Sequence, residues 1–223
     1  MDIIPVHCSL RLLNPDNRKD VAEAAKMHFE LLGWGEIAGL GQLFLEHFCY
    51  RTLVKDGLMK VSLYEVDGIP VGFIAYTTDS LNFHRKAMRK HFLYIFLLIA
   101  FSIIKKPSLI FNLPRAVRLI RSRRQEIGHP KKATAEILAI AVRPEYRTLA
   151  FNKRTSLRIS EALFYSAVSY CREAGMAHLD VFVDAFNTEA LLFYQSLGGI
   201  LKPCHRAGVD VYHVTFDLDF LHF

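Results

Sequence analysis

Apolar residues follow two different periods along this chain, and the changes of period predict where helices and strands lie. Alternation from Pro5 to Leu13 predicts a first strand, and Asn14-Pro15-Asp16 then signals a turn with Asp16 as a helix N-cap. Steps of three and four residues predict that helix over 21–32 and a second one over Leu43–Leu53. Asp67-Gly68, between two apolar runs, is the strongest short-range signal of a β-hairpin.

The C-terminal half continues the alternation of elements. Ala135–Val142 and His178–Val183 have the composition of buried strands, and Gly208–Leu218 alternates as a closing strand. Ser160–Gly175 and Asn187–Leu197 have helical periodicity, the first with Gly175 as its C-cap. The order β-α-α-β-β-insertion-β-α-β-α-β predicts an α/β sandwich around a mixed sheet, and the length favours one domain over residues 1–223.

The overall composition is that of a folded protein with an ordinary charged surface, which excludes intrinsic disorder. The first residues, MDIIPVHCSLRLL, have neither the basic region nor the cleavage site of a secretory signal, so we expect a cytoplasmic protein. The cysteines are scattered and form no C-x-x-C pair, which predicts reduced thiols and no metal site. They are Cys8, Cys49, Cys171 and Cys204.

The formal net charge of +6 is distributed unevenly. Residues 85–132 contain thirteen Lys and Arg and a single acid, Glu126, whereas acids outnumber bases in the rest of the chain. An anionic partner of this protein is therefore expected to meet that segment.

Three motifs resemble the GNAT superfamily of N-acyltransferases. NTEALLFYQSLGG resembles that family's N-x-x-A-x-x-F-Y-x-x-L-G-F signature and departs from it only at Gly199, where the family has an aromatic residue. AEILAIAVRPEYR is similar to the strand and turn that carry the family's V-x-P-x-Y-R segment, and DGIPVGFIAYTTD to its second and third strands. The motifs and the element order cover most of the chain outside residues 80–132. The resemblance implies a mixed, mostly antiparallel central sheet flanked by helices.

The resemblance also implies the residues that carry the reaction. Tyr194 would protonate the sulfur of the departing CoA, and Asn187 would cap its helix and bind the pantetheine arm; packing alone and capping alone remain the alternatives. Glu136 lies on the strand where family members often carry the base. A carboxylate in an apolar run is costly to bury unless it is paired or functional, although a solvent-facing glutamate is the alternative. His213 is a weaker candidate for the base.

The coenzyme-binding turn departs most from the family pattern. The family usually has R-x-x-G-x-G/A here, whose amides cradle a pyrophosphate, whereas EYRTLAFNKRTSLRIS contains no glycine. Counting back from Gly175 places the turn within 153–160, after a lengthened loop, and any positive φ in it would be strained without glycine. The coenzyme contacts implied are Ile140, Ala141, Val142, Lys153, Arg154, Ser156, Arg158, Ile159, Ser160 and Asn187.

The insertion, residues 84–124, combines an apolar run with basic flanks. Phe92–Ile104 is thirteen residues, fewer than the roughly 18–20 that span a bilayer, and a second helix is expected from Pro114. We expect a helical hairpin lying on an anionic membrane surface, on the inner face of the membrane. A helix pair packed on the core or a homodimer interface is the alternative. Nucleic acid is not expected, because the apolar run does not suit a surface that follows phosphates.

The sequence therefore predicts an enzyme that moves an acetyl or other acyl group from acyl-CoA to a primary amine. The amine acceptor would be a small molecule or a membrane-linked precursor, and acetyl-CoA the simplest co-substrate. Long-chain N-acyl transfer from an acyl carrier protein is a competing hypothesis, since such a carrier's acidic surface would meet the basic segment. A non-catalytic GNAT-like module that binds a ligand or a membrane is a third, which the glycine-free turn motivates.

Overall fold

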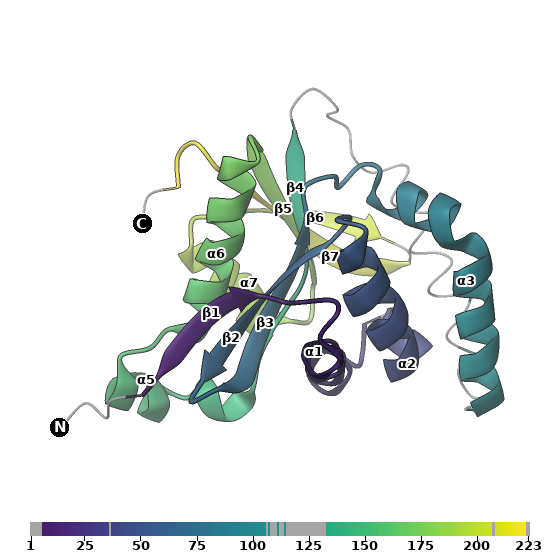
Figure 1. The fold of residues 1–223 in the computed structure, drawn as a ribbon. Coiled ribbons are helices and arrows are strands. Elements are labelled where there is room, and N and C mark those ends of the chain that lie inside the picture. Colours follow the sequence, from purple (N-terminus) through teal and green to yellow (C-terminus); the bar gives the residue numbers. More distant parts are fainter. Residues whose placement is uncertain are drawn as a thin grey trace.

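A mixed sheet of seven strands organises the protein (Figure 1). The structure, a computed structural model, describes residues 6–35, 37–105, 107, 111, 114, 133–206 and 208–221. The strand order is β1-β2-β3-β4-β5-β7-β6, and only the β4–β5 pair is parallel. The predicted α/β class and the mostly antiparallel sheet are thus confirmed. The strands are β1 Cys8–Leu12, β2 Lys60–Val66, β3 Ile69–Thr77, β4 Thr134–Val142, β5 His178–Asp184, β6 Ile200–Arg206 and β7 Val209–Asp217.

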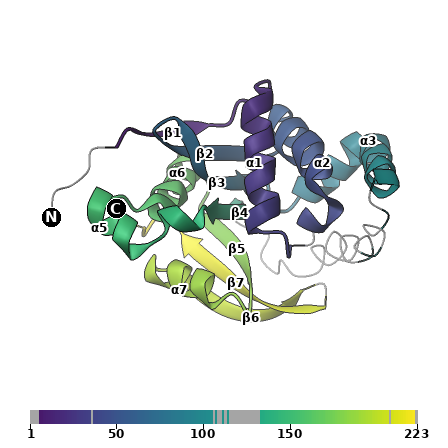
Figure 2. The same cartoon turned by 90° about the horizontal axis from the view of Figure 1, so that it is seen from below.

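Helices cover both faces of the sheet, as Figures 1 and 2 show from two directions. One face carries α1 (Arg18–Leu31), α2 (Gln42–Phe44) with the π-helical segment Leu45–Leu53 that continues it, and α3 (Phe83–Lys105). The other face carries α6 (Ile159–Glu173) and α7 (Thr188–Ser196). Each face buries its own hydrophobic cluster, so the sheet separates two cores.

Local signals in the N-terminal half were mostly correct. Asp67 and Gly68 form the predicted hairpin turn between β2 and β3, with φ of 51° and 75°. The N-cap of α1 is Asn17 rather than Asp16, because the Asn17 side chain accepts a 3.0 Å hydrogen bond from the amide of Lys19. Asp16 instead lies 2.8 Å from the ammonium of Lys55 on the surface.

Two elements of the C-terminal half were missed by the sequence pattern. β6 is an edge strand whose side chains are largely exposed, so its apolar residues do not alternate, and an edge tolerates Pro203. The helix α5 (Leu149–Thr155) lies between β4 and α6, where we expected a long loop. None of its residues is buried, so it has no apolar stripe that would reveal it in the sequence.

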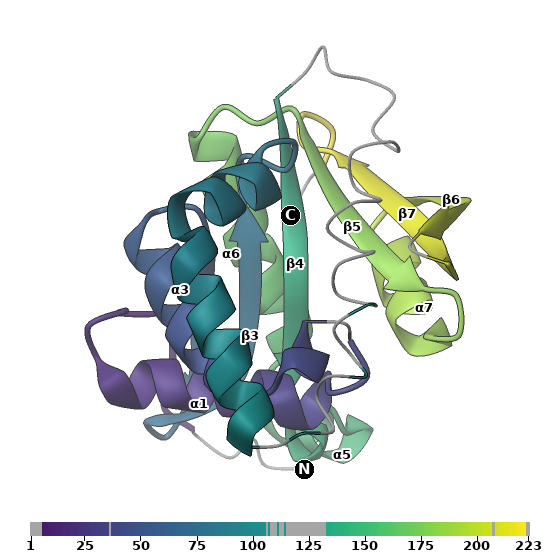
Figure 3. The same ribbon diagram turned by 90° about the vertical axis from the view of Figure 1, so that its right-hand side faces the viewer.

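The parallel pair β4 and β5 separates along its length (Figure 3). Thr134–Ile137 pair with His178–Val181, and beyond this point the two strands diverge. On its other side β4 has a bulge, because Leu138 has no partner on β3 between two residues that do. The divergence leaves strand edges of β4 and β5 without a ladder between them, and a mostly apolar cavity lies at this opening.

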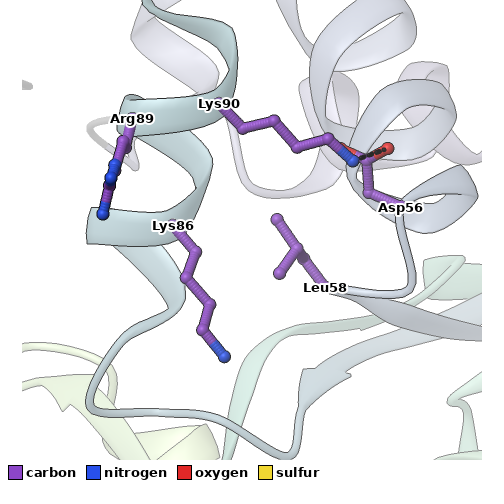
Figure 4. Close-up of a pocket in the computed structure, with 5 residues that line it drawn as sticks. All are labelled: Asp56, Leu58, Lys86, Arg89 and Lys90. Carbon is purple, nitrogen blue, oxygen red and sulfur yellow. Dashed lines mark ion pairs between the residues drawn. The ribbon is translucent and has the colours of Figure 1, made fainter.

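Helix α3 is the first part of the predicted insertion, and it bends at His91, where φ is −125° and ψ is 21°. Asp56, just after the π-helical segment, forms a 2.8 Å ion pair with Lys90 (Figure 4). The other oxygen of its carboxylate contacts Nε2 of His91. These contacts fix the bend next to the α1 face of the sheet. The second helix expected from Pro114 lies, apart from Pro114 itself, outside the described residues.

Candidate functional site

A cavity of about 380 Å³ extends from the divergence of β4 and β5 to the space beneath α2 and α3. At the strand end it is lined by polar residues, Glu136, Asp184, Asn187, Tyr194 and Arg206. At the helix end its walls are apolar, with Leu40, Phe44, Phe48, Phe83, Ala87, Met88, Ile95 and Ile99. A mostly apolar cavity with a few polar groups at one end is the usual form of a small-molecule site.

Glu136 lies on β4 immediately before the bulge, and its side chain is buried, with 2% of the residue exposed. The hydroxyl of Ser80 donates a 2.8 Å hydrogen bond to its Oε2. Its in-register neighbour on β5 is Asp180, which is also buried. Burial next to a hydrogen-bond donor and in the wall of a cavity differs from the solvent-facing alternative that the sequence left open.

His213, on β7, is the other sequence candidate for a base. Its Nε2 lies 3.1 Å from Oδ1 of Asp180, and its ring stacks on Phe182 with centroids 4.7 Å apart. The ring does not line the cavity described above. The carboxylate of Asp180 is therefore the partner of this histidine, which makes Glu136 the better-placed group of the two sequence candidates for a base.

Tyr194 faces the same cavity from α7 and has 2% of its surface exposed. Its ring packs among Phe164, Phe193 and Phe216. Burial raises the pKa of the Tyr194 phenol well above its ordinary value, so the hydroxyl stays protonated at neutral pH. A buried, protonated hydroxyl at the polar end of a cavity can act as a proton donor.

Asn187 forms the helix cap that the sequence predicted. Its side chain accepts a 3.1 Å hydrogen bond from the amide of Ala190 at the start of α7. It also lines the cavity, next to Tyr194 on the same helix.

Gly199 ends the α7 motif where an aromatic residue was expected, and the structure supplies the reason. A Cβ built on Gly199 would lie 2.6 Å from Cγ1 of Val214 and 2.8 Å from Cζ of Phe216. The ring of Phe216 contacts Tyr194 as well. Close approach of β7 thus excludes any side chain at this position.

The glycine-free stretch is built differently from the single turn over 153–160 that we expected. Lys153 and Arg154 belong to the last turn of α5, and Ser156 follows with φ of 58° and ψ of 15°. This left-handed conformation is one that glycine adopts most easily, so the serine carries the strain that the missing glycine predicted. Helix α6 then begins at Ile159, and its N-cap residue Arg158 makes no side-chain capping bond.

The predicted coenzyme residues divide into two groups. Only Ile140 and Asn187 line the cavity. The other residues lie on the strand end that leads to α6 or around the start of that helix: Ala141, Val142, Lys153, Arg154, Ser156, Arg158, Ile159 and Ser160. Among them Ala141, Val142 and Ile159 are buried.

Several cavity residues escaped the sequence analysis because no local pattern marks them. Nδ1 of His28, on α1, lies 2.6 Å from the hydroxyl oxygen of Tyr50, and burial lowers the pKa of His28 to about 4. Arg206 ends the edge strand β6, which the sequence did not predict. Within the described part of the chain, no cluster of His, Cys, Asp and Glu is arranged to hold a metal ion.

No protein-family model and no curated protein matches this sequence. Solved structures match the fold. An acetyltransferase of the GNAT family from Streptococcus pneumoniae is 13% identical, with 95% of this chain and 99% of that chain covered and a TM-score of 0.53. An N-acyl amino acid synthase from uncultured soil microbes is 13% identical over 97% and 94% of the two chains, with a TM-score of 0.53.

A PaiA N-acetyltransferase from Thermoplasma acidophilum, solved in complex with coenzyme A, is 12% identical over 95% and 99% of the two chains, with a TM-score of 0.54. At 12–13% sequence identity these structural similarities establish a shared fold, and they extend over nearly the full length of both chains. The seven-stranded sheet, its single parallel pair and the helices on both faces therefore have the GNAT fold.

Proposed function

We propose that this protein is an N-acyltransferase that moves an acyl group from acyl-CoA to a primary amine. The observation that carries the proposal is the convergence of Glu136 from β4 and Tyr194 from α7 on one cavity, at the divergence of β4 and β5. The amine nitrogen attacks the thioester carbonyl, the C–N bond forms and the C–S bond breaks. Glu136 accepts the amine proton, and Tyr194 gives its proton to the departing thiolate.

The strand divergence and the start of α6 support coenzyme binding. The edge of Leu138–Val142 that faces β5 has no ladder with that strand, and its backbone groups offer hydrogen bonds to the amides of a pantetheine arm. The first amides of α6, at Ile159 and Ser160, have no partner within the helix and form an anion site at its N-terminus. The Thermoplasma N-acetyltransferase, which has the same fold, was solved in complex with coenzyme A, which supports coenzyme A as the ligand.

The apolar end of the cavity favours an acyl chain longer than acetyl. Its walls come from α2, the π-helical segment and α3, and an acetyl group would leave most of them unfilled. Octanoyl-CoA is therefore expected to have a higher kcat/KM than acetyl-CoA. Ala87→Leu, which narrows this end, should reverse the preference and leave acetyl transfer nearly unchanged.

Calorimetric titration with CoA and octanoyl-CoA, followed by thiol-release kinetics with an amine, tests the proposal. Tyr194→Phe should keep the acyl-CoA affinity and lower kcat by about 10²–10³-fold. Tyr170→Phe, on α6 and outside the cavity, is the matched control. Tight coenzyme binding without turnover on any amine would favour the non-catalytic module instead, and no binding would contradict both.

A second part of the proposal is that α3 rests on an anionic membrane surface. By length and composition alone α3 could cross a membrane, with a mean hydropathy of 1.6, and 17% of its apolar window is buried. The bend at His91 leaves about 21 Å of straight helix after it, which is less than the roughly 30 Å of a bilayer core. A helix that lies in the interface therefore fits better than one that spans it.

The exposed side chains of α3 have the chemistry of a membrane-binding surface. Beyond the bend, large apolar residues face outward: Phe92, Leu93, Phe96, Leu97, Phe101 and Ile104. Before the bend, a shallow depression is lined by Lys86, Arg89 and Lys90 together with Asp56 and Leu58 (Figure 4). Lys86 pairs with Asp79 and Lys90 with Asp56, so Arg89 is the basic residue of this set with no ion pair among the described residues. Apolar residues next to basic ones match acyl chains and anionic head groups, respectively.

A further inference from the structure

Arg206 is the one Lys or Arg of the described residues that is buried, with 5% of its surface exposed. It ends β6 and lines the cavity that also contains Glu136 and Tyr194. Its guanidinium carbon lies 4.0 Å from the ring centroid of Phe182. Its Nε and Nη2 are buried and have no hydrogen-bond partner among the described residues.

No described residue accepts a hydrogen bond from Nε or Nη2 of this guanidinium. Arginine keeps its charge at any pH that a protein tolerates, and a buried charge without a partner is strongly unfavourable. The contact with Phe182 satisfies the face of the guanidinium but none of its N–H groups. Nε and Nη2 form one edge of the planar fork, and two parallel N–H groups on such an edge bind both oxygens of a carboxylate.

We infer that the amine acceptor carries a carboxylate, as an amino acid does, and that Arg206 binds this carboxylate while the amine faces Glu136. The inference rests on the proposed function and names its acceptor class. Arg206 thereby selects the acceptor and fixes its orientation. With the acyl chain in the apolar end of the cavity, the product would be an N-acyl amino acid.

The position of Arg206 favours an acceptor carboxylate over a phosphate of the coenzyme. The phosphates are expected at the start of α6, and neither Ile159 nor Ser160 lines the cavity that contains Arg206. Glu136 and Tyr194 do line it, so the thioester end of the donor and the amine must meet there. An anion next to Arg206 therefore enters with the amine.

A matched pair of ligands tests this without turnover. N-Octanoylglycine carries the carboxylate, and N-octanoylglycinamide is its uncharged counterpart of nearly the same shape. Calorimetry should show that the wild-type protein binds the carboxylate about 10²-fold more tightly than the amide. Arg206→Gln should abolish this preference, Arg206→Lys should restore only part of it, and the affinity for CoA should not change.

Thermal unfolding separates ligand recognition from a structural role. Arg206→Gln removes a buried charge whose Nε and Nη2 have no partner among the described residues, so Tm without ligand should stay the same or rise. N-Octanoylglycine should raise the Tm of the wild type and of Arg147→Gln, whose arginine is exposed and paired with Glu189, but not that of Arg206→Gln.

Three results would overturn the inference: equal affinity of the wild type for the two ligands, an unchanged preference in Arg206→Gln, or a loss of CoA affinity in that variant. The last would assign Arg206 to a coenzyme phosphate. If the carboxylate preference depends on Arg206 but no acyl-CoA binds, the proposed acyl transfer fails and the carboxylate site stands.

Discussion

The hydroxyl of Ser80 donates a 2.8 Å hydrogen bond to Oε2 of Glu136, and both residues are buried. Ser80 lies in the segment between β3 and α3, whereas Glu136 is on β4, 56 positions further along the chain. A hydrogen bond from a hydroxyl orients a buried carboxylate and supports its charged form. Ser80 thus positions the group to which we assign the amine proton.

Glu136→Gln should lower kcat/KM for amine acylation by about 10²–10³-fold, because an amide cannot accept the proton. The deficit should shrink as the pH rises, since more of the amine is then already neutral. Ser80→Ala should lower kcat/KM about tenfold in the thiol-release assay, because the carboxylate of Glu136 remains but is less well oriented. Wild-type rates in Glu136→Gln across the pH range would exclude Glu136 as the base.

Gly199→Ala should lower the free energy of unfolding by about 1–3 kcal/mol, because its Cβ would overlap Val214 and Phe216. Gly198→Ala is the comparison: a Cβ there meets nothing within 4 Å, but φ is 87°. Gly198→Ala should therefore lower the free energy of unfolding by only about 1 kcal/mol, through backbone strain. Urea denaturation of both variants measures the difference, and equal losses would refute the packing explanation.

His28 should make the stability depend on pH. Its pKa is lowered to about 4 in the folded protein against 6.5 for an ordinary histidine, so between these values the unfolded chain binds more protons. The contribution of His28 to the free energy of unfolding is complete above pH 6.5. It is lost as the pH falls toward 4, which lowers the free energy of unfolding by up to about 3 kcal/mol.

Urea denaturation from pH 4 to 7 should therefore show a shallower pH dependence for His28→Gln than for the wild type. His205→Gln is the control, because His205 lies exposed on β6. Parallel curves for the wild type and His28→Gln would contradict the burial argument.

The apolar face of α3 should bind anionic lipid. The protein should sediment with vesicles that contain phosphatidylglycerol and much less with pure phosphatidylcholine, and high salt should weaken the binding. Leu93→Ser with Phe96→Ser, whose side chains are 68% and 60% exposed, should reduce the affinity at least tenfold, an order-of-magnitude expectation from lost apolar burial.

Phe186→Ser with Leu192→Ser is the matched control, since these apolar residues are similarly exposed next to and on α7. Absence of sedimentation at low salt would contradict the membrane assignment. If the wild type is then a dimer in analytical ultracentrifugation and Leu93→Ser with Phe96→Ser a monomer, α3 is an interface between two copies instead.

Local sequence patterns were sufficient where neighbouring residues decide the structure. The Asp67-Gly68 turn, the α7 cap at Asn187 and the apolar run of β4 depend on backbone preferences and on periods of a few residues. The same patterns failed at β6 and α5, because an exposed edge strand and an exposed helix have no buried stripe to impose a period.

The sequence alone thus determined the fold class, through the order of elements along the chain, and its resemblance to a known family proposed Glu136 and Tyr194. Only the tertiary structure decided that these side chains share a cavity, that this cavity extends beneath α3, and that Nε and Nη2 of Arg206 are buried there with no partner among the described residues. These relationships join residues far apart in the chain, and their energies depend on burial and on distances in space. A one-dimensional pattern contains neither quantity, and folding supplies both.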